Sequence, residues 1–362
     1  MKELLNYGIN NKCSDIHITE RKISKVRMQG DIKNVTGKII GLDTIDGFVE
    51  EYMPKVLNKY IELREHRVLK PVDAAFEYLG RRFRANIYTS SSGINIAIRI
   101  LNDKILTLDK LCLPESIANF TELGTGLVLV VGTTGSGKST TLASIIDAIN
   151  HKRCENIITI EHPIEYKYVE DLCRIEQCEV GTHVESFDEA TIAAMRQDPD
   201  IVLVGELRDL PTIQNAVTLA ETGHLVFGTL HAKSIPDTVD RIIDVFPAGQ
   251  QEQIRFQVSS VLKGIVHQRL IKSNLGGMTP LVEMLMLDDV ASAMIRQRQK
   301  SNALRDYLRG KWEFGNVHIA DNAAWHSKCG RIDIESIKNM LLPDDYNIAK
   351  SILSERMIRG GF

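Results

Sequence analysis

The sequence predicts an α/β protein in which a small α/β domain precedes a mostly parallel sheet with helices on both faces. The chain has 362 residues, which is too long for one hydrophobic core of ordinary size. Polar and apolar side chains alternate in much of residues 15–100, as in half-buried strands. After residue 126, short apolar runs recur with helical patterns between them, which is typical of strand-helix units in a parallel sheet.

The N-terminal segment reads as an antiparallel sheet. Residues 15–28 and 75–88 contain alternating stretches, and isoleucines at every second position of 94–100 lie on one face of a further strand. The alternation is lost over residues 101–114, which read as a linker. We therefore expect a first domain at residues 1–105.

The strongest functional motif lies in residues 127–149. A β-branched apolar run is followed by Gly-x-x-x-x-Gly-Lys-Ser and then by apolar residues at helical spacing, which predicts a strand, a phosphate-binding loop and a helix. The glycines let backbone N–H groups surround phosphate oxygens, and the helix adds the positive end of its dipole. Lys138 would reach the β- and γ-phosphates of ATP, and the Ser139 hydroxyl would ligate Mg²⁺. The expected nucleotide-binding residues are Gly132, Thr133, Thr134, Gly135, Ser136, Gly137, Lys138, Ser139 and Thr140.

Three further strands are expected at residues 157–160, 201–204 and 225–229. The spacing of Ser186 and Glu189 predicts a capped helix before the second of these strands.

A long amphipathic helix is expected to run from Ile254 to Ile265, and the pattern after Gly277 is mainly helical. These expectations give a nucleotide-binding domain at residues 106–275 and a helical region at residues 276–362.

Candidate catalytic side chains follow the predicted strands, where open α/β sheets bind their ligands. Glu161 and Glu165 flank a proline and could position and deprotonate an attacking water. Glu206 follows the next strand and points to the metal with Ser139. His224 and His231 bracket the last of these strands. Each histidine could equally be structural, because histidines at strand ends often are.

In this order the motifs resemble those of the secretion-superfamily ATPases, and within them the ATPases that retract type IV pili. Residues 10–275 carry a Walker A motif, an acidic box, a Walker B motif and a histidine box. The resemblance implies a PAS-like N-terminal domain and a RecA-like ATPase domain with a helical C-terminal extension. It places Glu165 on the catalytic glutamate, Glu206 on the Walker B glutamate, and His224 and His231 on the histidine box.

Two features depart from the family pattern. His162 stands where the acidic box usually has an aspartate, so one negative charge is missing and the role of that aspartate does not transfer. The C-terminal region also lacks a short Ala-Ile-Arg-Ser type motif, which the family links to retraction.

The resemblance further implies a homo-hexamer that binds ATP and Mg²⁺ between subunits and drives pilus retraction, the basis of twitching motility. Arg84 and Arg99 would then reach the γ-phosphate of a neighbouring subunit, with Arg241 as a second candidate. The alternative is that Arg84 and Arg99 only form a solvated, charged face of the sheet. The implied partner is an inner-membrane platform protein of a pilus or secretion machine.

Composition limits the alternatives. A net charge of −3 argues against a protein that coats nucleic acid. No stretch has the length of a membrane span, and residues 1–15 lack the apolar core of a secretory signal, so we expect a cytoplasmic protein peripheral to the inner membrane. The nearest alternative is an ATPase of a type IV secretion or conjugation system. A nucleic-acid motor on the same core and a non-catalytic scaffold are the alternatives from other classes.

Overall fold

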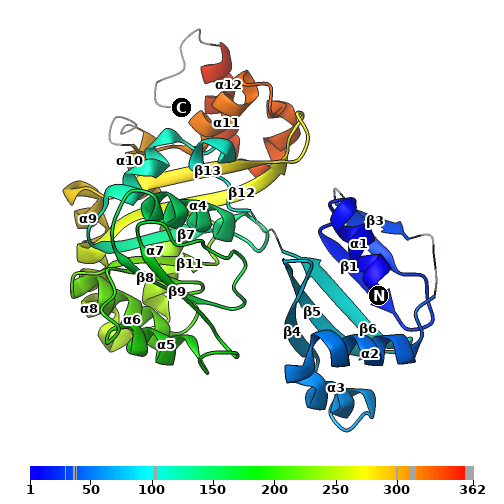
Figure 1. Cartoon of the computed structure of the whole chain (residues 1–362). Helices are drawn as coiled ribbons and strands as arrows, with labels where there is room; N and C mark the ends of the chain where they lie inside the picture. The colour runs from blue at the N-terminus through cyan, green and yellow to red at the C-terminus, as the bar shows by residue number, and fades with distance from the viewer. Residues whose placement is uncertain are drawn as a thin grey trace. The chain divides into compact units, whose positions relative to one another are not determined.

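The computed structural model describes residues 1–28, 30–35, 37, 39–101, 104–298, 301–309 and 315–354. The chain forms two compact units, shown in Figure 1. The first unit comprises Met1–Lys104 together with Glu165–Lys167, and the second comprises Ile105–Ile164 and Tyr168–Phe362. Each unit has its own sheet.

The first unit is built on a six-stranded antiparallel sheet with the order β3-β2-β1-β6-β5-β4. Its strands are β1 (Asp15–Thr19), β2 (Lys25–Met28), β3 (Asp31–Asn34), β4 (Val72–Tyr78), β5 (Arg81–Ser90) and β6 (Gly93–Ile100). Its helices are α1 (Lys2–Asn10), α2 (Leu42–Tyr52) and α3 (Leu57–Arg64).

One face of this sheet is buried under the three helices. Alternate residues of the strands, such as Ile16 and Phe83, share a hydrophobic core with Leu5 of α1, Phe48 of α2 and Tyr60 of α3. The side chains between them, including four arginines of β2, β5 and β6, lie on the opposite face. This confirms the alternation expected from the sequence.

The second unit contains a seven-stranded sheet with the order β13-β12-β7-β11-β10-β8-β9. Only the β12-β13 pair is antiparallel among the described strands of this sheet. The strands are β7 (Gly126–Val131), β8 (Asn156–Glu161), β9 (Arg174–Glu179), β10 (Ile201–Val204), β11 (Leu225–Leu230), β12 (Leu262–Lys272) and β13 (Met278–Met286).

Helices cover both faces of this sheet. They are α4 (Lys138–Asn150), α5 (Phe187–Ala194), α6 (Leu210–Glu221), α7 (Ile235–Asp244), α8 (Gln251–Val261), α9 (Asp289–Arg296), α10 (Ser301–Arg309), α11 (Ile319–Lys328) and α12 (Pro343–Ser354). Strand β7 shows the two layers, because Leu129 packs with residues of α6, α7 and α8 whereas Val128 packs with residues of α4. The cap expected at Ser186 is present at the start of α5, and Asp209 caps α6.

Two expectations from the sequence were wrong. The helix that begins near Ile254 ends at Val261, and Leu262 begins strand β12 instead of continuing the helix to Ile265. Gly276 and Gly277 form the turn of a β12-β13 hairpin, so the residues directly after them are a strand. Edge strand β9 was not expected either.

The C-terminal helices pack on the end of this hairpin. Residues of α11 and α12 share a small core with Ile271 and Leu281. The carboxylate of Asp345, buried on α12, is paired with Arg305 and Arg309 of α10.

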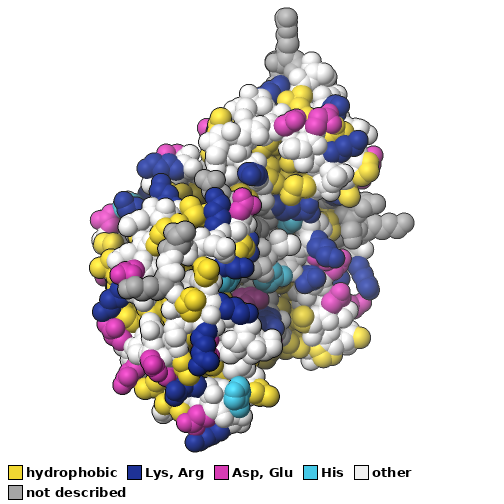
Figure 2. Space-filling view, turned by 90° about the vertical axis from the view of Figure 1, so that its right-hand side faces the viewer, with side chains coloured by type: hydrophobic (Ala, Val, Ile, Leu, Met, Phe, Trp, Pro, Cys, Tyr) yellow, Lys and Arg dark blue, Asp and Glu magenta, His cyan; other side chains and the backbone are white. Residues whose placement is uncertain are grey.

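Charged side chains of both signs are interspersed over the face shown in Figure 2, and hydrophobic side chains are scattered among them. Among the described residues, no helix combines the length and apolar character that crossing a bilayer would require.

Candidate functional site: a phosphate loop at the carboxyl edge of the sheet

The phosphate loop connects β7 to α4. Gly132, Gly135 and Gly137 have φ angles of +149°, +77° and +88°, values that residues with a side chain rarely adopt. Gly137 caps helix α4, whose first residue is Lys138. The Lys138 ammonium donates to the carbonyl oxygens of Gly132 and Thr133 at 3.1 and 3.0 Å. The loop is thus closed around its own lysine.

The loop has the chemistry of a phosphate site. The hydroxyl of Ser136 is buried, and it has no hydrogen-bond partner among the described residues. A Cβ at Gly132 would lie 2.7 Å from this hydroxyl, so only glycine leaves room for the turn. No neighbouring atom of the described chain fills the space beside Gly135. A buried hydroxyl, a lysine and the N–H groups of a helix N-terminus together suit a polyphosphate.

The parallel register brings the ends of four strands to this same edge. Val131 of β7 pairs with Leu230 of β11, Gly228 of β11 pairs with Val204 of β10, and Val204 pairs with Ile160 of β8. Gly132, Glu206 and His231 follow these strands, and Glu161 is the last residue of β8. The register thus places these residues at one edge of the sheet.

Glu206 and His231 follow neighbouring strands, and their side chains lie close together. His231 Nε2 lies 3.7 Å from Glu206 Oε1, and both side chains are partly exposed. Two hydrogen bonds join the chain segments that carry them. The Leu207 N–H donates to the Thr229 carbonyl at 2.8 Å, and the Thr229 hydroxyl donates to the Gly205 carbonyl. The Glu206 carboxylate is therefore held at the same sheet edge as the phosphate loop.

The two glutamates of the acidic box, Glu161 and Glu165, lie in different environments. Glu161 accepts from the Thr159 hydroxyl at 2.7 Å and from the Gln177 amide at 3.2 Å, both within the sheet. Glu165 is half-buried and groups with the first unit. The His162-Pro163 peptide bond between them is cis, and His162 Nδ1 lies 3.0 Å from the Val180 carbonyl oxygen.

Sequence reasoning missed the carboxylate that shapes this box. Glu179 at the end of β9 is buried, and it accepts from the Ile164 N–H at 3.1 Å and the Thr182 hydroxyl at 3.0 Å. The sequence did not indicate Glu179 because strand β9 was not expected.

The structure does not bring His224 to the loop. The His224 carbonyl accepts from the N–H of Gly126, at the start of β7, whereas the loop follows the end of β7. Each of the two strands has six residues, and at ~3.3 Å per residue the two edges are roughly 20 Å apart. The Nδ1 of His224 lies 2.9 Å from the Leu219 carbonyl oxygen, as expected of a structural histidine just after helix α6.

The candidate arginines of the first unit form a row across its sheet. Arg84 of β5 stands directly opposite Arg99 of β6, and Arg99 stands opposite Asp15 of β1. Arg99 donates to Asp15 at 3.0 Å, and the Arg84 guanidinium lies 3.8 Å from Asp73. Both arginines keep a large exposed fraction, 41% for Arg84 and 58% for Arg99, so an anion could still reach them.

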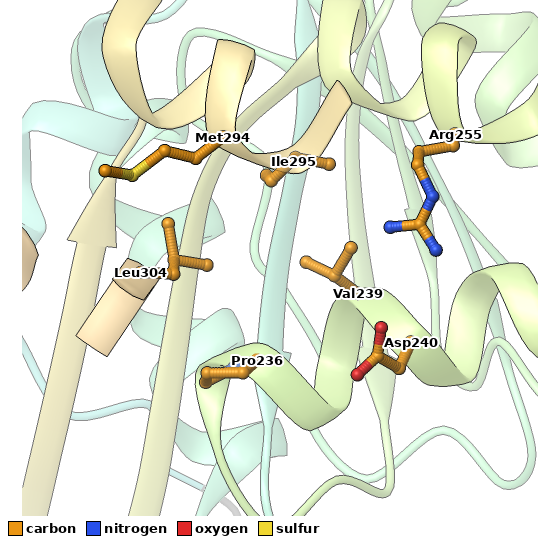
Figure 3. A pocket seen from close by; sticks show the side chains of 7 residues that line it. All are labelled: Pro236, Val239, Asp240, Arg255, Met294, Ile295 and Leu304. Atoms are coloured by element: carbon orange, nitrogen blue, oxygen red, sulfur yellow. The ribbon is translucent and has the colours of Figure 1, made fainter. Parts of the chain in front are cut away.

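Arg241 on α7 is paired within its own helix. Its Nε lies 3.3 Å from Asp237, which also accepts from the Lys233 N–H in the loop after His231. Figure 3 shows a pocket beside this helix whose lining includes none of the expected site residues. The lining residues are Pro236, Val239, Asp240, Arg255, Met294, Ile295 and Leu304.

Gln268 of β12 is a second residue that the sequence did not indicate. Its buried side chain donates to the Ser136 carbonyl at 2.8 Å and accepts from the Thr141 hydroxyl at 2.7 Å. These partners lie more than a hundred residues away in sequence, so no local motif could have revealed them.

Comparisons with known proteins agree with this geometry. Residues 1–324 match the family described as "Type II/IV secretion system protein". The chain is 36% identical to the type IV pilus retractation ATPase PilT of Pseudomonas aeruginosa over 312 residues, which cover 83% of this chain and 89% of that protein. It is 37% identical to a twitching motility protein of Neisseria gonorrhoeae over 76% of this chain and 72% of that protein.

A solved structure has the same fold throughout. The crystal structure of the pilus retraction motor PilT with bound ADP superposes with a TM-score of 0.81 at 37% identity, and the match covers 94% of this chain and 96% of that one. The ATPase DotB of Legionella pneumophila, at 23% identity and a TM-score of 0.80, shares the fold over 94% of each chain. The chain therefore belongs to the type II/IV secretion system protein family and is one of its ATPases.

Proposed function

We propose that this ATPase is a Mg²⁺-dependent, hexameric motor that retracts a type IV pilus at the cytoplasmic face of the inner membrane. One observation carries the proposal. A phosphate loop, Glu206 and His231 meet at one sheet edge in a chain that is 36% identical to a pilus retractation ATPase. The similar solved structure of a pilus retraction motor contains bound ADP, which supports a nucleotide at this loop.

The residues at the loop would divide the work of phosphoryl transfer. Lys138 exchanges its two carbonyl partners for the β- and γ-phosphates, and the helix N-terminus holds the same oxygens. Mg²⁺, when bound, neutralises charge on the phosphates, and Ser139 and Glu206 are the side chains that would hold it. A magnesium ion keeps several water ligands, so two protein ligands are enough.

Hydrolysis also needs a base and positive charge at the γ-phosphoryl group. Glu165 would position and deprotonate the water, as the resemblance implies, while Glu161 is already committed to Thr159 and Gln177. His231 would sense the γ-phosphate through its contact with Glu206. Arg84 and Arg99 would reach the nucleotide of a neighbouring subunit, and a platform protein of the inner membrane would receive the motion.

The decisive experiment removes the gene from its own host and counts pili. Loss of a retraction motor should leave pili extended, so surface piliation should rise while twitching motility is lost. A Glu165→Gln copy should fail to restore motility, and the wild-type copy should restore it. Unchanged piliation together with lost secretion or conjugation would refute retraction and establish the secretion-system alternative. ATPase activity that requires added nucleic acid would instead establish the nucleic-acid motor.

A further inference from the structure

We propose that Gln268 is a positioning residue for ATP, acting through the backbone of the phosphate loop. Strand β12 runs beside β7, from which the loop departs, and His267 is paired in register with Val131. Gln268 is therefore the β12 residue beside the start of the loop. It is 2% exposed, and both ends of its amide are used.

The first contact fixes the orientation of one peptide group. The Gln268 Nε2 donates to the Ser136 carbonyl at 2.8 Å, which draws that oxygen towards β12. In a trans peptide the C=O and the following N–H point in opposite directions. The N–H of Gly137 is therefore directed away from β12, to the side where the loop receives phosphate oxygens.

This peptide needs such a restraint. Gly137 has a φ of +88° and no side chain, so its backbone could adopt other conformations at little cost. A Cβ at Gly137 would come within 2.6 Å of the Gln268 Nε2, which shows how closely the amide lies against the loop. The Gln268 amide thus fills the space that the missing side chain of Gly137 leaves. It also restrains the Gly137 backbone to the conformation with a positive φ.

Two further contacts make the support continuous. The Gln268 Oε1 accepts from the Thr141 hydroxyl at 2.7 Å, which fixes the amide against the first turn of α4. The Ser136 carbonyl can only accept, so it defines which end of the amide donates. The backbone carbonyl of Gln268 lies so close to Gly132 that a Cβ at that glycine would overlap it, so β12 also abuts the start of the loop. One residue therefore supports the loop at both ends.

The inference rests on ATP binding at this loop, and it is tested by the ATP affinity of purified, assembled protein. Gln268→Leu keeps the approximate volume and removes both side-chain bonds. We expect its Kd for ATP to rise about tenfold or more, in line with the loss of a buried hydrogen bond and a freed peptide group. Thr141→Val keeps the Ser136 bond and should raise Kd by a smaller factor, roughly two- to fivefold.

Asn322→Leu supplies the matched control. Asn322 is also a fully buried amide, and its Oδ1 accepts from the Val282 N–H at 2.9 Å, in the small C-terminal core and not at the loop. It should lower the melting temperature of the nucleotide-free protein while leaving the Kd for ATP unchanged. Gln268→Leu should change both, and nucleotide should raise its melting temperature less than it raises that of the wild type.

The outcomes separate the inference from the proposed function. Wild-type protein that binds no ATP would refute the function itself. Wild-type binding together with an unchanged Kd in a folded Gln268→Leu or Thr141→Val variant would overturn the positioning role. If Gln268→Leu does not fold, Thr141→Val decides alone, because replacing a hydroxyl by a methyl group in the first turn of α4 preserves its shape.

Discussion

At the scale of single residues, Lys138 is one of the side chains that hold the phosphate loop in shape. Its ammonium donates to two loop carbonyls. We expect Lys138→Ala to weaken ATP binding roughly 10- to 100-fold, as for a lost hydrogen bond between charged groups. Calorimetric titration measures this. Lys152→Ala, which removes an exposed lysine paired with Glu122, is the control and should bind normally. Unchanged affinity in Lys138→Ala would count against ATP at this loop.

Glu165 and Glu161 should differ in kinetic effect although they lie in the same box. Glu165→Gln should leave ATP affinity nearly intact and lower turnover by ~10²-fold or more, because a general base acts only in the transition state. Glu161→Gln should have a smaller effect on turnover, since its carboxylate serves Thr159 and Gln177. Steady-state rates at saturating ATP, combined with Kd values, distinguish the two. If the larger loss falls on Glu161→Gln, the base is Glu161.

The residues that the sequence could indicate are those with partners close by along the chain. The loop motif and Glu206 after an apolar strand depend on local spacing, and the sequence located both. Gln268 and Glu179 depend on contacts between strands that are neighbours only in space. A glutamine inside an apolar run and a glutamate in a charged one carry no local pattern, so only the fold reveals them.

At the scale of elements, strand β12 shows why the end of helix α8 could not be predicted from the sequence pattern. Ile254, Val258, Val261 and Leu262 follow helical spacing, and Ile265 continues it, so this spacing predicts a helix that extends into the strand. Strand β12 is buried on both faces over most of its length, and a buried strand shows no alternation that could break the helical pattern.

The other two missed strands have different causes. Strand β9 is an edge strand rich in charged side chains, so it lacks the apolar run that marked its neighbours. Strand β13 is rich in methionine and leucine, which favour helices, and its strand conformation follows from pairing with β12 along nine positions. In both strands tertiary pairing overrides local preference.

Helix α11 should make the second unit sensitive to acid. Burial lowers the pKa of His326 to about 4. Because this folded-state pKa lies below the ordinary value of 6.5, the stability it contributes is present above pH 6.5 and is lost as the pH falls towards 4. Full protonation would cost roughly 3 kcal/mol. His326→Leu should therefore lose less unfolding free energy between pH 7 and pH 4.5 than the wild type.

Urea unfolding monitored by tryptophan fluorescence measures this difference in unfolding free energy. The ring centroids of Trp325 and His326 are 4.5 Å apart, so the fluorescence reports on this region. The comparison uses the pH dependence within each protein, so a general loss of stability in the variant does not affect it. An equal decline in both proteins would show that His326 is not the titrating group.

At the scale of the whole molecule, activity should require assembly. Lys138 lies in the second unit and Arg84 in the first, and we place the two at one nucleotide only across a subunit boundary. An arginine supplied in this way can contribute ~10³-fold to turnover. Mixing inactive Lys138→Ala chains with inactive Arg84→Ala chains should therefore restore part of the ATPase activity, because some interfaces would combine an intact loop with an intact arginine.

The control for this mixture is Lys138→Ala mixed with Lys138→Ala,Arg84→Ala chains, which cannot form an intact interface and should remain inactive. Subunit exchange is followed by the mass of the mixed assemblies. An inactive first mixture in which mixed assemblies demonstrably form would refute the shared arginine, as would dilute monomers that hydrolyse ATP at the full rate.

The facing positions of Arg84 and Arg99 have a consequence for the isolated subunit. Two guanidinium groups directly opposite each other on neighbouring strands repel, and each also lies near a carboxylate, Asp15 for Arg99 and Asp73 for Arg84. A polyanion bound over this facing pair would reduce the repulsion between the two guanidinium groups. Selection for a stable monomer would remove one of these arginines, whereas selection for a working ring would retain both. Under the proposed function, this facing pair of arginines serves the nucleotide of a neighbouring subunit and not the stability of its own sheet.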